Sequence, residues 1–271
     1  MIETRHTSLA DRELADAAFG GRPGQWPLPT ATTPRQLWLR AVACGGQGRY
    51  GSAFDDLAAL RRAGDRRLVS LAHSTHGSFL RQLGWHASAR GWDGRALALA
   101  GGDPEAGVDA LIGLAADALG VGRFAASAAL LARADGSLAA GPVPDRLPVR
   151  RGWVGAELAM ASGDGATALR HAEEAVELAR AMAVTSARHR VKSDVVLAAA
   201  LCSSGKTERA RAVAEAALDD TGRLGLLPLR WALSCLLVDI GSVTFSTQKL
   251  QEIRHICAGQ VRHAGGTWRS A

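Results

Sequence analysis

Two short glycine-containing stretches have the residue types of phosphate-binding loops. Residues 46–51 match the pattern GxGxxG, and Gly205-Lys206-Thr207 resembles the end of a P-loop. Both motifs bind phosphate where a β-strand precedes the glycines and a helix follows them. Here a helical pattern precedes the glycines of both motifs, and each motif contains a glycine of the repeated turn described below. We therefore expect neither a nucleotide nor another cofactor.

Three histidines in the first third of the chain have the residue type of metal ligands. His73 and His76 lie three residues apart on a predicted helix, so they share a face, and His86 follows nearby in sequence. No carboxylate or cysteine completes the set at a characteristic spacing. We therefore favour packed or solvated histidines over a metal site.

The sequence offers no recognisable nucleophile motif. It contains no GxSxG elbow and no CxxC pair, and its cysteines are widely spaced: Cys44, Cys202, Cys235 and Cys257. In apolar or helical surroundings such cysteines are expected to be reduced thiols. We therefore predict a non-catalytic protein. Its function must then be inferred from the helical elements and the surface that they form.

A turn signal recurs five times and organises most of the chain. Its glycines are Gly48, Gly84, Gly122, Gly163 and Gly205, spaced by 36, 38, 41 and 42 residues. A small residue stands five positions after each glycine (Ala53, Ala89, Ser127, Ala168, Ala210) and another seven positions before it (Ala41, Gly77, Ala115, Ala156, Ala198). Glycine supplies the left-handed conformation that ends a helix, and small residues let two helices approach closely. The pattern predicts helix hairpins that must stack to bury their apolar faces.

This pattern resembles the tetratricopeptide repeat over roughly residues 34–219. The first repeat matches best, with Ala41, Gly48, Tyr50 and Ala53. The resemblance implies an all-α fold, a right-handed superhelical stack of antiparallel helix hairpins. The repeats exceed the usual 34 residues of this family, so we expect longer helices or connections. Similar stacks occur in bacterial signalling and transcription proteins. Arginine far outnumbers lysine here, as expected for a GC-rich genome. We therefore expect a bacterial and, more narrowly, an actinobacterial source.

Three regions are predicted along the chain. Residues 1–33 are expected to form a short helix over 8–19 and a flexible linker over 20–33. Residues 34–245 hold five hairpins and a following helix, and residues 246–271 a capping helix and tail. The apolar face of the capping helix is expected to carry Leu250, Ile253, Ile256 and Val261. Three prolines within 136–148 predict a longer loop, which could also separate two sub-domains.

The repeat register predicts which side chains face the concave groove. It places Trp38 and Trp153 there, and an exposed tryptophan in a groove is typical of a binding anchor. The alternative is that the longer repeats shift the register and bury both rings. The same register places six charged residues toward the groove: Arg35, Arg81, Asp109, Arg150, Glu157 and Lys192. Because four of them are basic, an acidic peptide or a carboxylate is the expected ligand.

Composition limits the partners without choosing among them. The formal charge of +6 favours acidic partners, including nucleic acid. However, acidic residues are interspersed with the basic ones, and no helix carries a continuous basic stripe. The best candidate patch for nucleic acid is the C-terminal end, with Arg254, His255, Arg262, His263 and Arg269. The N-terminus lacks the apolar core of a signal peptide and no stretch is long enough to span a membrane, so we expect a cytoplasmic location.

These observations lead to two functional hypotheses. The first is a non-catalytic scaffold that binds a peptide or partner protein on its concave face, through a surface that includes Trp38, Arg81, Arg150, Trp153 and Glu157. The alternative is a regulatory module in bacterial signalling or transcription, in which a ligand or partner changes the superhelix. Direct contact with nucleic acid is the third possibility. The absence of a recognisable catalytic or DNA-binding motif favours the scaffold.

Overall fold

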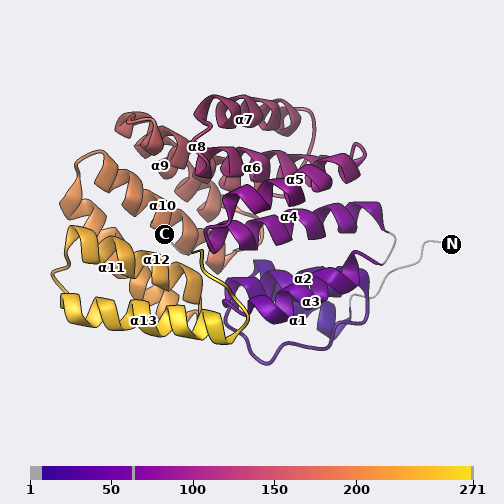
Figure 1. Ribbon diagram of the computed structural model, residues 1–271, viewed down its shortest axis with the longest axis horizontal. Helices are drawn as coiled ribbons and strands as arrows, with labels where there is room; N and C mark the ends of the chain where they lie inside the picture. Colours follow the sequence, from indigo (N-terminus) through magenta and orange to yellow (C-terminus); the bar gives the residue numbers. More distant parts are fainter. Residues whose placement is uncertain (1–7, 63–64, 270–271) are drawn as a thin grey trace.

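The computed structural model describes residues 8–62 and 65–269, and these ranges contain thirteen α-helices and no β-strand. The helices are α1 (Leu9–Phe19), α2 (Pro34–Gly46), α3 (Tyr50–Leu60), α4 (Arg66–Gln82), α5 (His86–Ala100), α6 (Pro104–Gly120), α7 (Phe124–Ala139), α8 (Arg146–Ala161), α9 (Gly165–Ala181), α10 (Ala187–Ser203), α11 (Thr207–Arg223), α12 (Leu227–Ile240) and α13 (Thr247–His263). Helices α2 to α11 pair as the five predicted hairpins, and α12 packs on α13 as a sixth (Figure 1). The predicted all-α stack of hairpins is confirmed.

All five predicted turn glycines have left-handed backbone conformations. Their φ angles lie between 75° and 89°. At Gly163 a Cβ atom would meet nothing within 4 Å, so backbone conformation rather than crowding favours glycine there. Each turn therefore reverses the chain at the position that the sequence pattern predicts.

The predicted small residues lie where the two helices of each hairpin meet. All ten are buried. Gly77 of α4 and Gly113 of α6 also leave room for the carboxyl group of Asp93, because a Cβ atom at either position would overlap its oxygen atoms. Small side chains thus serve helix packing, and at these two glycines they also accommodate a buried acid.

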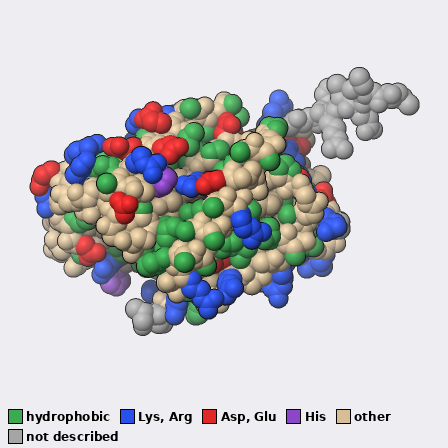
Figure 2. All heavy atoms as spheres, turned by 90° about the horizontal axis from the view of Figure 1, so that it is seen from above, with side chains coloured by type: hydrophobic (Ala, Val, Ile, Leu, Met, Phe, Trp, Pro, Cys, Tyr) green, Lys and Arg blue, Asp and Glu red, His purple; other side chains and the backbone are tan. Residues whose placement is uncertain are grey.

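The first helices of the hairpins form an inner layer and the second helices an outer layer. Each first helix contacts the first helix of the next hairpin: α2 with α4, α4 with α6, α6 with α8, α8 with α10 and α10 with α12. Figure 1 shows α7, α9, α11 and α13 along the outside of the stack. Seen from above, basic and acidic side chains occur together around the rim, with hydrophobic side chains between them (Figure 2).

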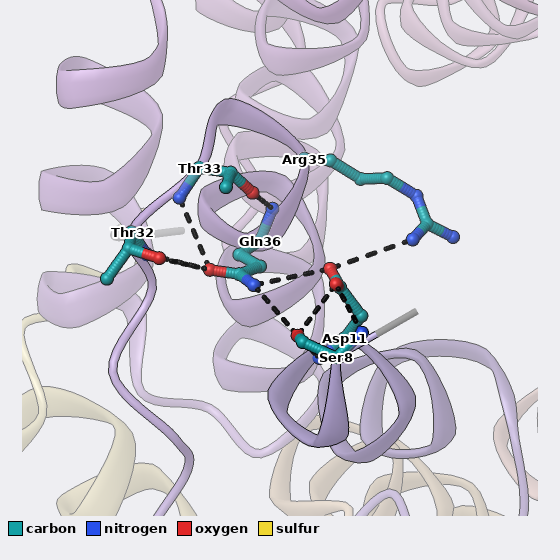
Figure 3. A network of polar contacts seen from close by, with 6 residues as sticks. All are labelled: Ser8, Asp11, Thr32, Thr33, Arg35 and Gln36. Atoms are coloured by element: carbon teal, nitrogen blue, oxygen red, sulfur yellow. Dashed lines mark hydrogen bonds and ion pairs between the residues drawn. The ribbon is translucent and has the colours of Figure 1, made fainter. Parts of the chain in front are cut away.

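A polar network fixes α1 against the start of α2 (Figure 3). Ser8 and Asp11 form a capping box on α1, and Thr33 and Gln36 form another on α2. The Gln36 Nε2 group lies 3.4 Å from Ser8 Oγ and 3.3 Å from Asp11 Oδ1, which joins the two caps. Arg35, expected in the groove, instead lies 3.8 Å from Asp11.

Segment 20–33 follows a defined path between the first and fifth hairpins. The Ala187 N–H donates to the Gly20 carbonyl at 3.0 Å, which joins the end of α1 to the start of α10. Gln47 Nε2 donates to the carbonyl groups of Pro23 and Gln25 at 2.8 and 3.0 Å. The division of the chain at residues 33 and 245 stays a prediction.

The two ends of the stack meet, so the solenoid closes on itself. Val261 of α13 belongs to the same buried cluster as Tyr50 of α3. The Gly51 N–H donates to the Ala264 carbonyl at 2.8 Å. Further along the tail, the Trp85 indole N–H donates to the Thr267 carbonyl at 2.7 Å. The C-terminal tail therefore binds the first two hairpins as well as following the last one.

Two details of the sequence prediction are wrong. Ile256 is 51% exposed, and Cys257 takes its place on the buried face of α13. Position 256 is six residues after Leu250, which turns it to the other side of the helix. The expected loop over 136–148 shrinks to residues 140–145, because α7 continues to Ala139 and Pro148 lies in the first turn of α8. Proline is tolerated there since the first turn needs no backbone N–H donor.

No helix in the described part of the chain is both long and apolar enough to cross a bilayer.

Candidate functional site

The first helices enclose a cavity of about 370 Å³ on the inner side of the stack. Each of α2, α4, α6, α8, α10 and α12 contributes lining residues, and α1 adds Phe19. The walls are mostly apolar, with Val42, Phe79 and Ile112 among the lining side chains. Within this lining five basic residues face two acidic ones: Arg81, Arg146, Arg150, Arg188 and Lys192 against Asp109 and Glu157. An apolar cavity with a few charged groups has the composition of a ligand site.

All five residues predicted for a binding surface line this cavity. They come from three hairpins: Trp38 from α2, Arg81 from α4, and Arg150, Trp153 and Glu157 from α8. The repeat register brings them together because equivalent positions on successive first helices face the same side of the stack. Their role in binding remains a proposal.

The two tryptophans belong to the wall more than to the open space. Trp38 is 7% exposed, so the expectation of an exposed anchor is wrong for it. Its indole N–H donates to Thr75 Oγ1 at 3.1 Å. Trp153 is half-buried; its indole N–H donates to Ser193 Oγ at 2.8 Å and its ring stacks on His189. Each indole thus bonds a hydroxyl on the next first helix, which satisfies its polar group.

Arg81 is committed to an internal ion-pair cluster. Its side chain is 10% exposed and contacts the carboxylates of Asp93 and Asp117, the latter at 2.8 Å. Burial raises the pKa of Asp93 to about 7, and repulsion from Asp117 adds to the rise. Arg81 therefore ties α4 to α5 and α6, and its charge is already neutralised.

A second cluster joins α6 to α8. Arg146 Nη2 donates to Glu105 Oε1 at 2.7 Å, and its Nη1 lies 3.4 Å from Asp109 Oδ1. Arg150 also contacts Asp109. On α10, Lys192 Nζ lies 3.4 Å from Glu157 Oε1, a partly exposed pair. Four of the five cations in the lining thus have an acidic partner.

Arg188 is the exception among the lining cations. Within the described residues it makes no ion pair, and its one hydrogen bond goes from Nη1 to the Val42 carbonyl at 3.3 Å. Its side chain lies along Gly46, where a Cβ atom would be 3.2 Å from Arg188 Cδ. Burial, with repulsion from Arg146, lowers the pKa of Arg188 to about 10.

Phe19 and His189 complete the surroundings of Arg188. The guanidinium carbons of Arg146 and Arg188 lie 5.4 and 5.9 Å from the centroid of the Phe19 ring. Burial lowers the pKa of His189 well below its usual value, and the neighbouring arginines lower it further. A neutral His189, hydrogen-bonded to Ser186 Oγ at 2.7 Å, is consistent with a positive local potential.

Sequence reasoning missed Arg146, Arg188 and His189. A signal was present: Arg146 and Arg188 both stand 17 residues before the turn glycines of their hairpins, Gly163 and Gly205. The same position in the repeat indicates that both side chains point toward the same side of the stack. The missing information was how far each first helix extends toward its N-terminus, since α8 begins at Arg146 itself.

The histidines and the glycine motifs singled out in the sequence form neither a metal site nor a phosphate-binding loop in the described residues. His73 and His76 pack against the Trp92 ring, whereas His86 lines the cavity. Across the described residues, no group of three potential ligands could hold a metal ion. Gly46 is the last residue of α2, Gly48 follows that helix rather than a strand, and Gly205 follows α10.

Comparison with known proteins supports the fold. Among solved structures the chain is similar to NprR in complex with its cognate peptide NprX, with a TM-score of 0.63 and 13% sequence identity, over 89% of this chain and 74% of that one. No protein-family model and no curated protein matches the sequence. At this identity the similarity establishes fold and not function. With the hairpins described above, it shows that the chain folds as a TPR-like all-α solenoid.

Proposed function

We propose that this protein is a non-catalytic scaffold that binds a peptide, or a peptide-like segment of a partner protein, in the cavity of its first helices. The observation that carries the proposal is the convergence of six first helices on one largely apolar cavity with an excess of basic side chains. Such a site suits an apolar segment that carries an acidic group. NprR, which has the same type of fold, forms a complex with a peptide, which supports the proposal.

The test is a selection of peptides in solution with variants that fill the cavity. A synthetic library of N-acetylated octapeptides is incubated with the protein, and retained peptides are identified by mass spectrometry. Ala116→Trp and Ala232→Trp each add a large ring to the cavity lining, from α6 and α12 respectively. Ala132→Trp is the matched control on the exposed face of α7.

We expect the wild type and Ala132→Trp to retain the same peptides, and both cavity variants to lose them. Far-UV circular dichroism and the unfolding midpoint verify that each variant is folded. Equal retention by all four proteins would place binding elsewhere, and no retention by the folded wild type would contradict the proposal.

A regulatory role is the second candidate, and the position of Phe19 favours it. This residue ends α1, packs on Trp38 with ring centroids 5.3 Å apart, and lines the cavity. A ligand in the cavity would therefore contact the element that connects the first and fifth hairpins. If ligand binding is signalled through α1, its amide hydrogen exchange should slow on addition of a retained peptide. Unchanged exchange in α1 would favour a passive scaffold.

A further inference from the structure

The first helices carry a row of charged residues at one repeat position. In hairpins two to five, the residue 17 positions before the turn glycine is Arg67, Glu105, Arg146 and Arg188, respectively. Because equivalent positions on stacked repeats are neighbours, these side chains follow one another along the stack. The signs are positive, negative, positive and positive.

The first three members of this row pair with one another. Glu105 lies between two arginines: it contacts Arg67 on one side and accepts a hydrogen bond from Arg146 at 2.7 Å on the other. The side chains of Glu105 and Arg146 are at most 10% exposed, so their charges need partners close by. Alternation of sign thus links three consecutive hairpins.

The alternation ends between Arg146 and Arg188. Both guanidinium groups approach the Phe19 ring, yet within the described residues no carboxylate pairs with Arg188. Asp109, an acid of the cavity lining, already contacts Arg146 and Arg150. Arg67 also lies 3.2 Å from Asp103. Counted together, four arginines (Arg67, Arg146, Arg150 and Arg188) face three carboxylates (Asp103, Glu105 and Asp109), which leaves one positive charge without a partner.

We propose that a single carboxylate of the bound ligand occupies the position beside Arg188 and Arg146, and continues the row as Glu105 does between Arg67 and Arg146. This inference rests on the proposed peptide-binding function and specifies which ligand group the cavity recognises. Arg188 retains donors that its one bond to Val42 leaves unused. A carboxylate accepts two such donors in a bidentate pair.

The cavity favours one ionised group at the end of an apolar segment. Only one positive charge is left over, so a monoanion neutralises the group. The apolar lining includes Val42, Phe79 and Ile112 and suits the side chain next to that carboxylate. A carboxylate can come from the C-terminus of a peptide or from an Asp or Glu side chain, and the experiment separates these sources.

The test uses three sets of N-acetylated octapeptides with the full-length protein. The first set has free C-terminal carboxylates and no Asp or Glu. The second is identical but amidated, and the third is amidated with Asp and Glu allowed. We expect the wild type to bind members of the first or third set about 10- to 100-fold more tightly than the second, because hydrogen bonds to charged groups are strong.

Substitutions at Arg188 assign the preference to this side chain. Arg188→Met removes the charge, and Arg188→Glu supplies the missing carboxylate from the protein itself; both should abolish the preference for a carboxylate. Arg133→Met removes an exposed arginine on α7, and this variant should keep the preference for a carboxylate. Circular dichroism confirms folding, and if Arg188→Met is unfolded, Arg188→Glu carries the test.

The outcomes separate the two proposals. Preference for the first set identifies a terminal carboxylate, and preference for the third set alone identifies a side-chain carboxylate. Equal binding of all three sets, lost in Ala116→Trp, would overturn the carboxylate site and leave the peptide scaffold in place. A preference that survives in a folded Arg188→Met variant would overturn it as well. Binding of none of the sets would overturn both.

Discussion

Replacing Arg188 should stabilise the ligand-free protein, whereas replacing its neighbour Arg146 should destabilise it. Arg188 lacks an acidic partner within the described residues, and burial lowers its pKa to about 10 from a reference value of 12.5. A shift of this size corresponds to about 3 kcal/mol of unfavourable free energy for the charged form in the folded state. Because Arg188 is partly exposed, solvent screening reduces this to about 2 kcal/mol.

Arg188→Met removes that unfavourable term. It also removes the hydrogen bond to the Val42 carbonyl, which contributes about 1 kcal/mol. The net expectation is an increase of about 1 kcal/mol in the free energy of unfolding. With an unfolding entropy of about 2 cal/mol/K per residue, this raises the midpoint of a chain of this length by about 2 °C.

Arg146→Met should lower the free energy of unfolding, because two buried acids lose one of their partners. Glu105 and Asp109 would each lose a buried partner and keep only Arg67 and Arg150, respectively. Breaking a buried pair costs about 3 kcal/mol or more. The same deletion of a guanidinium group therefore has opposite effects at two neighbouring positions.

The assay is urea unfolding of the wild type and three variants, followed by far-UV circular dichroism. Arg133→Met is the control, since an exposed substitution of this kind changes stability by no more than about 0.5 kcal/mol. A decrease in the free energy of unfolding for Arg188→Met as large as that for Arg146→Met would contradict this prediction. That result would mean that Arg188 has a stabilising partner within the protein.

Three further predictions concern the fold and its polar groups. Gly163→Ala should destabilise by about 1 kcal/mol in urea unfolding because of its left-handed φ, whereas Gly136→Ala, inside α7, should stabilise by up to about 1 kcal/mol. The raised pKa of Asp93 means that its contribution to stability is fully present below about pH 4 and is lost as the pH rises to about 7, so Asp93→Asn should flatten the fall between about pH 4 and 7. Trp153→Phe should cost about 1 kcal/mol by calorimetry, since Ser193 loses its indole donor.

The repeat positions were predictable because their causes are local. A glycine with a positive φ ends a helix wherever it stands, and a small residue is needed wherever two helices touch. Gly48 and Gly205 follow this rule equally well, although 157 residues separate them. The concave direction of Trp38 and Trp153 follows from the same register, and so both line the cavity.

The degree of exposure was less predictable because it depends on neighbours distant in sequence. Phe19 covers Trp38 only because the capping network and the hydrogen bond at Gly20 hold α1 across the first and fifth hairpins. The apolar pattern of α13 predicts Ile256 on the buried face, but the helical period places Cys257 there instead. Three prolines close together predict a loop, but Pro148 lies in the first turn of α8, where a helix accepts proline.

The residue pattern alone predicts that this chain is a stack of helix hairpins, where each hairpin turns and which helix face points inward. Those properties depend on backbone conformation and side-chain size within one repeat. The packing of the whole chain determines that the ends of the stack meet and which arginines pair with an acid. Ion pairing between hairpins depends on side chains 35 to 41 residues apart, such as Lys192 with Glu157 or Arg146 with Glu105. Arg81 and Arg188 are the same residue type on the same cavity, and packing alone gives one of them two carboxylates and the other none.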